Sequence, residues 1–478
     1  MGRKNSLAYN QELNKLILQY ETAQAEGKQL YLDADQLADI ADRYAAERRF
    51  TDAQNVINYG LYLHSGNTDL MLEQAYLYLD TQMLDMAKEM ADKITEEYNA
   101  DVKLLKAEIF LSEGLLEAAQ NILNTINESD DLETMINIVY LFLDMGYPEE
   151  AKEWLDKGKS LYNENEDFIA VKADYLMRTN HLDTAIDHYE RLIDMDSYNP
   201  AYWMGIAKCR FAKEECDKAI EACDFALAAD DKCGEAYAYR AHSYFYLNNQ
   251  EEAMSNYQKA MEYKAIPPEM GYMFIGMGHS NREEWKEAYE CYLKVIQLFE
   301  KNNDENSPLL PDTYANAAVA AAKLGNYEEA HLFCDKGKQI NPDDYVIFIT
   351  EGKLYLEEKA EKKARKSFQK ALKIEAGPDS MYQIACAFSD ADELITAKLY
   401  FEEVYKLDPD FLDVTERLSV LCLMHNEIDN FFKYNQECAR PINEDIILEL
   451  LSQKDSSDEG IKLLQEVLER MRKENNKD

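Results

Sequence analysis

The chain has 478 residues, 46% of them hydrophobic, and 92 acidic against 51 basic residues give it a formal net charge of −41. This length exceeds what one hydrophobic core holds, so several domains or a repeat array are expected. Such a charge repels phosphate backbones, and we expect no lysine- or arginine-rich stripe to offset it, so nucleic-acid binding is not expected.

The sequence has no run of 18 apolar residues, the length that a membrane helix requires, so no membrane span or membrane partner is expected. Its nine cysteines are odd in number and form no C-x-x-C pair. This usage fits a reducing compartment better than a disulfide framework, and it predicts a cytoplasmic protein.

The first predicted element is a helix within residues 6–28, and a similar apolar face recurs near the other end of the chain. The faces consist of Leu13, Leu16, Ile17 and Tyr20 at the start, and of Ile461, Leu464, Val467, Leu468 and Met471 at the end. We interpret both as caps that shield the open ends of a repeat array. Residues 1–33 are assigned to the N-terminal capping helix, and residues 441–478 to C-terminal capping helices and a tail.

Between the caps, small residues recur at a fixed interval. With each unit numbered 1 to 34, position 20 is alanine in eleven units: Ala53, Ala87, Ala119, Ala151, Ala185, Ala219, Ala253, Ala288, Ala330, Ala364 and Ala397. Position 8, twelve residues earlier, is small in all units but one: Ala41, Ala75, Ala107, Val139, Ala173, Ala207, Ala241, Gly276, Ala318, Gly352, Ala385 and Ser419. Apolar residues follow at helical spacing, so each unit is predicted to be two helices that approach closely at these positions.

This pattern resembles the tetratricopeptide repeat family over roughly residues 34–440. Trp203 matches the family's first-helix aromatic residue, and Pro342 and Pro409 match its closing proline. The first four units lack that proline, and the twelfth has Phe431 at position 20. The resemblance implies an all-α fold, a right-handed α-solenoid of about twelve helix-turn-helix repeats.

One interval between units is longer than the others, with 42 residues from Ala288 to Ala330. It divides the array into units 1–8 over residues 34–297, an insertion at 298–311, and units 9–12 over residues 312–440. A simple surface insertion and a hinge between two arrays are both compatible with this spacing.

In this family, first-helix positions 2, 5, 9, 12 and 13 line the concave face, and here many of them are apolar. The residues that the resemblance implies for a binding groove are Tyr140, Met177, Met204, Phe211, His242, Phe245, Tyr246, Met273, Met277 and Tyr382. An exposed strip of rings and methionines is typical of a peptide-binding site, and the alternative is that neighbouring units bury these side chains. Position 2 is acidic in nine of twelve units. A carboxylate near a helix start caps bare amides and suits the helix dipole; the alternative is an acidic rim, which would favour an apolar ligand with basic flanks.

No catalytic, metal or cofactor site is expected. Cys209, Cys216 and Cys223 are seven residues apart and fit helix packing better than metal binding, and Gly276 and Gly278 lie within a predicted helix. The sequence therefore predicts a non-enzymatic scaffold that binds a peptide or partner protein in its concave groove. A peptide-responsive sensor and a structural subunit of an assembly are the alternatives, and the oligomeric state is left open.

Overall fold

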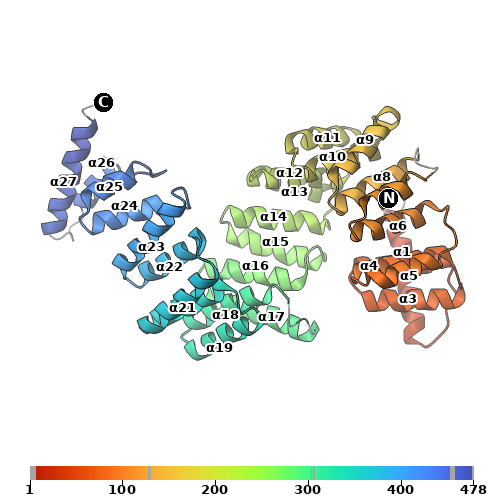
Figure 1. Cartoon of the computed structure of the whole chain (residues 1–478), viewed down its shortest axis with the longest axis horizontal. Helices are drawn as coiled ribbons and strands as arrows, with labels where there is room; N and C mark the ends of the chain where they lie inside the picture. The colour runs from red at the N-terminus through yellow and green to blue at the C-terminus, as the bar shows by residue number, and fades with distance from the viewer. Residues whose placement is uncertain (1–6, 127–130, 303, 305–306, 453–457, 476–478) are drawn as a thin grey trace. The chain divides into compact units, whose positions relative to one another are not determined.

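The computed structural model describes residues 7–126, 131–302, 304, 307–452 and 458–475 (Figure 1). Over these residues the chain forms 27 helices and no strand, which confirms the predicted all-α solenoid fold. By its internal contacts the chain divides into two units, Met1–Tyr239 and Arg240–Asp478, and the boundary falls within α14 (Gly234–Tyr246).

The first unit begins with α1, which precedes the hairpins and buries Leu13 and Tyr20 in one hydrophobic cluster with Leu37 of the next helix. Each following pair of helices is one hairpin, with the even-numbered helix first (Figure 1). The helices are α1 (Leu7–Ala25), α2 (Ala34–Ala46), α3 (Phe50–Leu63), α4 (Thr68–Asp80), α5 (Leu84–Lys93), α6 (Ala100–Ser112), α7 (Leu116–Leu123), α8 (Leu132–Asp144), α9 (Pro148–Tyr162), α10 (Glu166–Arg178), α11 (Leu182–Met195), α12 (Pro200–Ala212) and α13 (Cys216–Ala229).

The second unit continues the same pattern of hairpins. Its remaining helices are α15 (Gln250–Glu262), α16 (Pro268–Asn281), α17 (Trp285–Asn302), α18 (Leu310–Lys323), α19 (Tyr327–Ile340), α20 (Tyr345–Glu357), α21 (Glu361–Ile374), α22 (Pro378–Asp390), α23 (Leu394–Leu407), α24 (Val414–Met424), α25 (Ile428–Asn435), α26 (Glu444–Ser452) and α27 (Asp458–Asn475). Part of the predicted insertion thus continues α17 to Asn302. The last helix buries Val467, Leu468 and Met471.

The small residues of the repeat lie where the two helices of each hairpin meet. All eleven alanines of position 20 are 0% exposed, and every residue of position 8 is buried. Position 8 faces a side chain of the second helix, because a Cβ atom added to Gly352 would lie 2.2 Å from Cε1 of Phe368. The small residue of position 8 thus leaves room for a ring four positions after the alanine of position 20, and a contact between the two small residues themselves stays a prediction.

A left-handed residue ends the first helix of each hairpin, always seven positions after the small residue of position 8. Three of these turns use glycine (Gly114, Gly146 and Gly325), and φ at Gly146 is +79°. The others use residues with a side chain: Arg48, Gln82, Asn180, Glu214, Asn248, Glu283, Lys359, Asp392 and Asn426. The left-handed conformation of the turn is thus kept even where a residue with a side chain is sterically strained in it.

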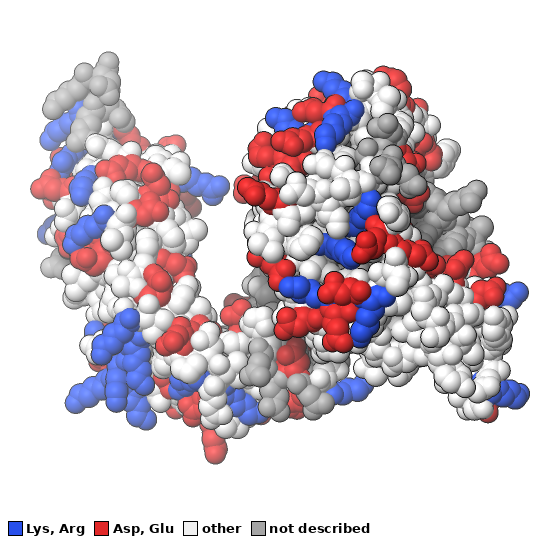
Figure 2. All heavy atoms as spheres, turned by 45° about the vertical axis from the view of Figure 1, so that its right-hand side comes forward, with Lys and Arg blue, Asp and Glu red and all other residues white. Residues whose placement is uncertain are grey.

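The expectation that no lysine-rich stripe exists is wrong. Helix α21 and the turn before it carry exposed lysines along one face, and Figure 2 shows a block of adjacent basic side chains at the lower left, where α21 lies in Figure 1. The excess of acidic residues over the whole sequence hides this local excess of basic ones.

Candidate partner-binding site

Two neighbouring pockets in the first unit share the side chain of Tyr76. The pocket between α2, α3 and α4 has a volume of about 220 Å³, and the pocket between α4, α6 and α8 has a volume of about 250 Å³. Both are lined by residues from positions 9 and 13 of the first helices, which point out of the hairpins rather than into them. We call this region the acid–tyrosine cleft, and its acidic and tyrosine residues are Asp42, Glu73, Tyr76, Asp80, Asp101, Glu108, Tyr140 and Asp144.

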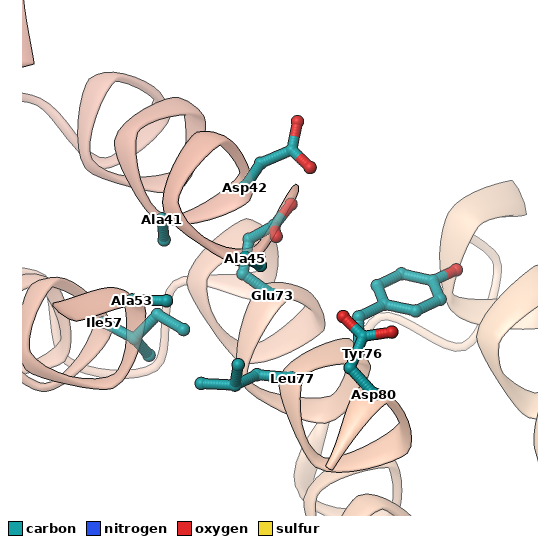
Figure 3. Close-up of a pocket in the computed structure, with 9 residues that line it drawn as sticks. All are labelled: Ala41, Asp42, Ala45, Ala53, Ile57, Glu73, Tyr76, Leu77 and Asp80. Atoms are coloured by element: carbon teal, nitrogen blue, oxygen red, sulfur yellow. The ribbon is translucent and has the colours of Figure 1, made fainter. Parts of the chain in front are cut away.

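The floor of the first pocket is apolar, and its rim is acidic (Figure 3). Ala41, Ala53, Ile57 and Leu77 come from the buried interfaces of the hairpins. Asp42 of α2 and Glu73 of α4 extend to the same side in Figure 3. A chain segment in this pocket would therefore meet methyl groups below and carboxylates above.

Asp80 is an exposed carboxylate of the cleft and Glu108 is partly buried, and neither has a cationic partner among the residues that the structure describes. Burial raises the pKa of Asp80, and the negative charge of Asp42 raises it further. Burial also raises the pKa of Glu108 to about 7, with smaller contributions from the charges of Asp80 and Asp144. Asp80 and Glu108 thus contribute negative charge that no cation of the described residues neutralises by an ion pair.

The hydroxyl of Tyr76 has no hydrogen-bond partner within the described residues. Burial raises its pKa, followed by the negative charges of Glu108, Asp101 and Glu73. The phenol therefore stays protonated and presents one donor and acceptor between carboxylates.

At the α8 end of the cleft, the side chains of Tyr140 and Asp144 have hydrogen-bond or ion-pair partners within the chain. The hydroxyl of Tyr140 donates to the carboxylate of Asp174, which also accepts a hydrogen bond from Tyr189. Asp144 pairs with Arg178, whose guanidinium carbon lies 5.8 Å from the centre of the Tyr140 ring. The unsatisfied part of the cleft is therefore limited to the surroundings of Tyr76, Asp80 and Glu108.

Four of the groove residues predicted from the sequence lie in the first unit. Tyr140, Met177 and Phe211 are partly exposed, whereas Met204 is only 2% exposed and packs among α10, α11 and α12. The ring of Phe211 meets that of Tyr239 edge-on, with centroids 5.7 Å apart.

The other six lie in the second unit. His242 and Phe245 of α14 both contact the ring of Phe274, with centroids 5.2 Å and 6.3 Å apart, and a ring nitrogen of His242 lies 2.8 Å from the Tyr257 hydroxyl. Beside them, Tyr246 is 70% exposed.

The remaining three of these side chains are held more closely. Met273 is 6% exposed and Met277 is partly exposed, both on α16. Tyr382 of α22 donates to Asp413 and accepts a hydrogen bond of 2.9 Å from Nε of Arg417. Within each unit the structure therefore brings some of the predicted residues together, and their role in binding stays a prediction.

The sequence analysis missed Asp42, Asp80 and Glu108. These residues occupy positions 9 and 13, the same positions from which the apolar groove residues were chosen. The predicted groove included mainly apolar side chains and therefore left out the acidic ones, although their repeat positions place them among the groove residues.

A chain of stacked helical hairpins belongs to the class of helical-repeat solenoids. Models of the tetratricopeptide repeat match residues 132–165, 171–232, 234–266, 311–344 and 378–411. The chain is a tetratricopeptide repeat protein, and its repeats make it a protein–protein interaction scaffold. Repeats of this family are generally non-catalytic.

Comparison with proteins of curated function gives no match. Among solved structures, yeast Tom70 is 15% identical and matches with a TM-score of 0.42, covering 93% of this chain and 96% of its own. A tetratricopeptide repeat protein from Parabacteroides merdae is 16% identical with a TM-score of 0.40, covering 62% and 99%. The Cut9–Hcn1 complex of the APC/C is 13% identical with a TM-score of 0.37, covering 86% and 94%. These likenesses are too loose to indicate a shared function.

The described residues contain no group of three or more His, Cys, Asp or Glu side chains placed to hold a metal ion. None of their helices combines the length and the apolar character needed to cross a membrane.

Proposed function

We propose that the acid–tyrosine cleft binds a segment of a partner protein through a lysine or arginine side chain. The observation that carries this proposal is a partly buried Glu108 and an exposed Asp80, neither with a cation among the described residues, beside a Tyr76 hydroxyl that has no hydrogen-bond partner there. The apolar floor accepts the methylene stem of such a side chain, and the carboxylates accept its charged end.

The charge distribution supports this choice of ligand. Removing a carboxylate from water is unfavourable unless an opposite charge or hydrogen-bond donors replace the lost hydration. A guanidinium or ammonium group between Asp80 and Glu108 supplies both, and it lowers the pKa of Glu108 because the ionised form then gains a partner. An acidic peptide would instead add to the repulsion already present.

Apolar residues on either side of the basic one would reach the partly exposed members of the predicted groove. In the first unit these are Tyr140, Met177 and Phe211. We also place the scaffold in the cytoplasm, a proposal supported by nine cysteines that are all free thiols.

The test is a binding measurement on the full chain with three fluorescent peptides that share one apolar core. Their flanks carry lysine and arginine, glutamine, or glutamate, and binding is followed by anisotropy. We expect the basic peptide to bind best, and the pair of substitutions Asp80→Asn and Glu108→Gln to weaken it at least tenfold, which corresponds to about 1.4 kcal/mol.

The matched control replaces Glu117 and Asp156 by their amides. Both are exposed carboxylates on second helices of the same unit, so the change in net charge is identical. Equal loss of affinity in both variants would reduce the effect to long-range attraction, and equal binding of all three peptides would refute the proposal.

A further inference from the structure

We propose that the exposed lysines of α21 form a second docking surface, separate from the acid–tyrosine cleft, that binds an acidic segment of a partner protein. The surface, here called the lysine face, consists of Lys359, Lys362, Lys363, Lys366, Lys370 and Lys373, all exposed. Four of them follow the helical spacing i, i+4, i+8 and i+11, so they share one side of α21. Figure 2 shows the resulting block of basic side chains.

Two neighbouring cations, Arg365 and Lys398, are paired, and those of the lysine face are not. Arg365 of the same helix bonds Glu361 and Glu393 at 2.7 Å and 2.9 Å, and Lys398 of α23 bonds Glu427 at 2.5 Å. Within the described residues, no carboxylate lies within ion-pair distance of any lysine of the face. Its charge is therefore available to a partner.

Folding does not require this arrangement. Lys362 and Lys363 lie in the first turn of α21, where the helix dipole favours acidic residues. Lys362, Lys366 and Lys370 follow one another at four-residue steps, a spacing at which like charges repel. Only Lys363 and Lys370 contact rings, with their amines 5.0 Å and 5.3 Å from the centres of Tyr355 and Phe348. Lys373, in the last turn, suits the helix dipole. The other lysines on this side of α21 cost some helix stability, which favours a role outside the fold.

Apolar side chains lie at matching positions on the second helices before and after α21. Leu332 of α19 and Leu399 of α23 occupy the repeat position of Lys366 and are 54% and 58% exposed, and Ile395, at the position of Lys362, is 70% exposed. A segment with glutamates or aspartates between apolar residues complements both features.

The limited size of the lysine face favours a short protein segment over a nucleic acid or a lipid surface as its ligand. Helix α21 has 14 residues, which is about 21 Å at the usual rise per residue. Carboxylates flank it, with Glu358 before the helix and Glu403 on α23, both exposed. An extended polyanion would meet these carboxylates, whereas a short acidic segment contacts the lysines alone. The face also offers lysines rather than the arginine forks and exposed rings that suit bases and phosphates.

The experiment measures binding of four probes to the full chain: a labelled peptide of alternating glutamate and leucine pairs, its glutamine analogue, a single-stranded DNA of similar length, and phosphatidylserine vesicles. In the test variant Lys362, Lys366, Lys370 and Lys373 become glutamine. The control variant replaces Lys152, Lys157, Lys159 and Lys232, which are exposed lysines of the first unit, so both variants have the same net charge.

We expect the glutamate peptide to bind, the glutamine analogue to bind at least tenfold more weakly, and the test variant alone to lose at least tenfold in affinity. Thermal unfolding of the test variant should be unchanged or shifted upward, since like charges are removed. The inference is overturned if the acidic peptide fails to bind at about 1 mM, if both variants bind it equally, or if only DNA or vesicles bind. Because the cleft is tested with basic peptides, failure of either proposal leaves the other standing.

Discussion

The raised pKa of Glu108 predicts that the free energy of unfolding depends on pH. The ordinary pKa of a glutamate is 4.5, and burial in the acid–tyrosine cleft raises that of Glu108 to about 7. Since a tenfold change in proton affinity corresponds to about 1.4 kcal/mol, the native chain holds this proton more tightly than the unfolded chain by about 3 kcal/mol. Below pH 4.5 both states are protonated, so the stabilisation is fully present there. It is lost as the pH rises to 7, because the unfolded chain ionises first.

Glu108→Gln removes this dependence, because glutamine keeps the size of the side chain and does not ionise. We expect the variant to exceed the native chain in stability at pH 8 by up to about 3 kcal/mol, and the difference to disappear near pH 4.5. Urea unfolding of both proteins, followed by circular dichroism at several pH values, measures this difference. A difference that is constant from pH 4.5 to 8 would refute the argument that Glu108 is ionised at a cost.

Three further predictions concern the hairpins and the cleft. Gly352→Ala places a Cβ atom 2.2 Å from the ring of Phe368, and it should lower the free energy of unfolding by about 1–3 kcal/mol; an unchanged urea midpoint would contradict the contact assigned to position 8. Gln82→Gly should stabilise the chain by up to about 1 kcal/mol, because glycine adopts the left-handed turn without steric cost, whereas Gly146→Ala should destabilise it by a similar amount in the same assay. Tyr76→Phe should leave the thermal midpoint unchanged, as no described residue bonds its hydroxyl, yet weaken the basic peptide in the anisotropy assay.

The repeat register was predictable because one physical requirement recurs in every unit. Two helices can pack closely where a small side chain on one leaves room for a larger one on the other, as Gly352 does for the ring of Phe368 within one hairpin. The residue size that each such position requires depends only on its own hairpin. The spacing of small residues in the sequence is therefore sufficient to predict the repeat register. The left-handed turns were only partly predictable, because a residue such as Gln82 adopts the conformation that the packing of its hairpin imposes.

The exposure of the groove residues could not be derived in the same way. Met204 and Met277 both belong to first helices and were selected by the same rule, yet Met204 is buried and Met277 is partly exposed. The difference depends on the side chains that adjacent hairpins place against them. In the first unit Met204 lies in a cluster with Ile169, Ala173 and Tyr189 from the preceding hairpin. Burial of this kind depends on pairs of residues 15 to 35 positions apart, which a pattern within single helices does not describe.

The lysine face was missed for an electrostatic reason. A net charge of −41 describes the field far from the molecule, but at physiological ionic strength charges are screened beyond about 8 Å. A face about 21 Å long, by the rise of an α-helix, therefore acts as a positive surface toward any ligand that fits on it, whatever acidic residues lie farther away. The negative net charge therefore argues only against acidic partners that are larger than the basic surface. Local charge also decides the ligand of the acid–tyrosine cleft, where Asp80 and Glu108 make the surface negative and favour a basic side chain.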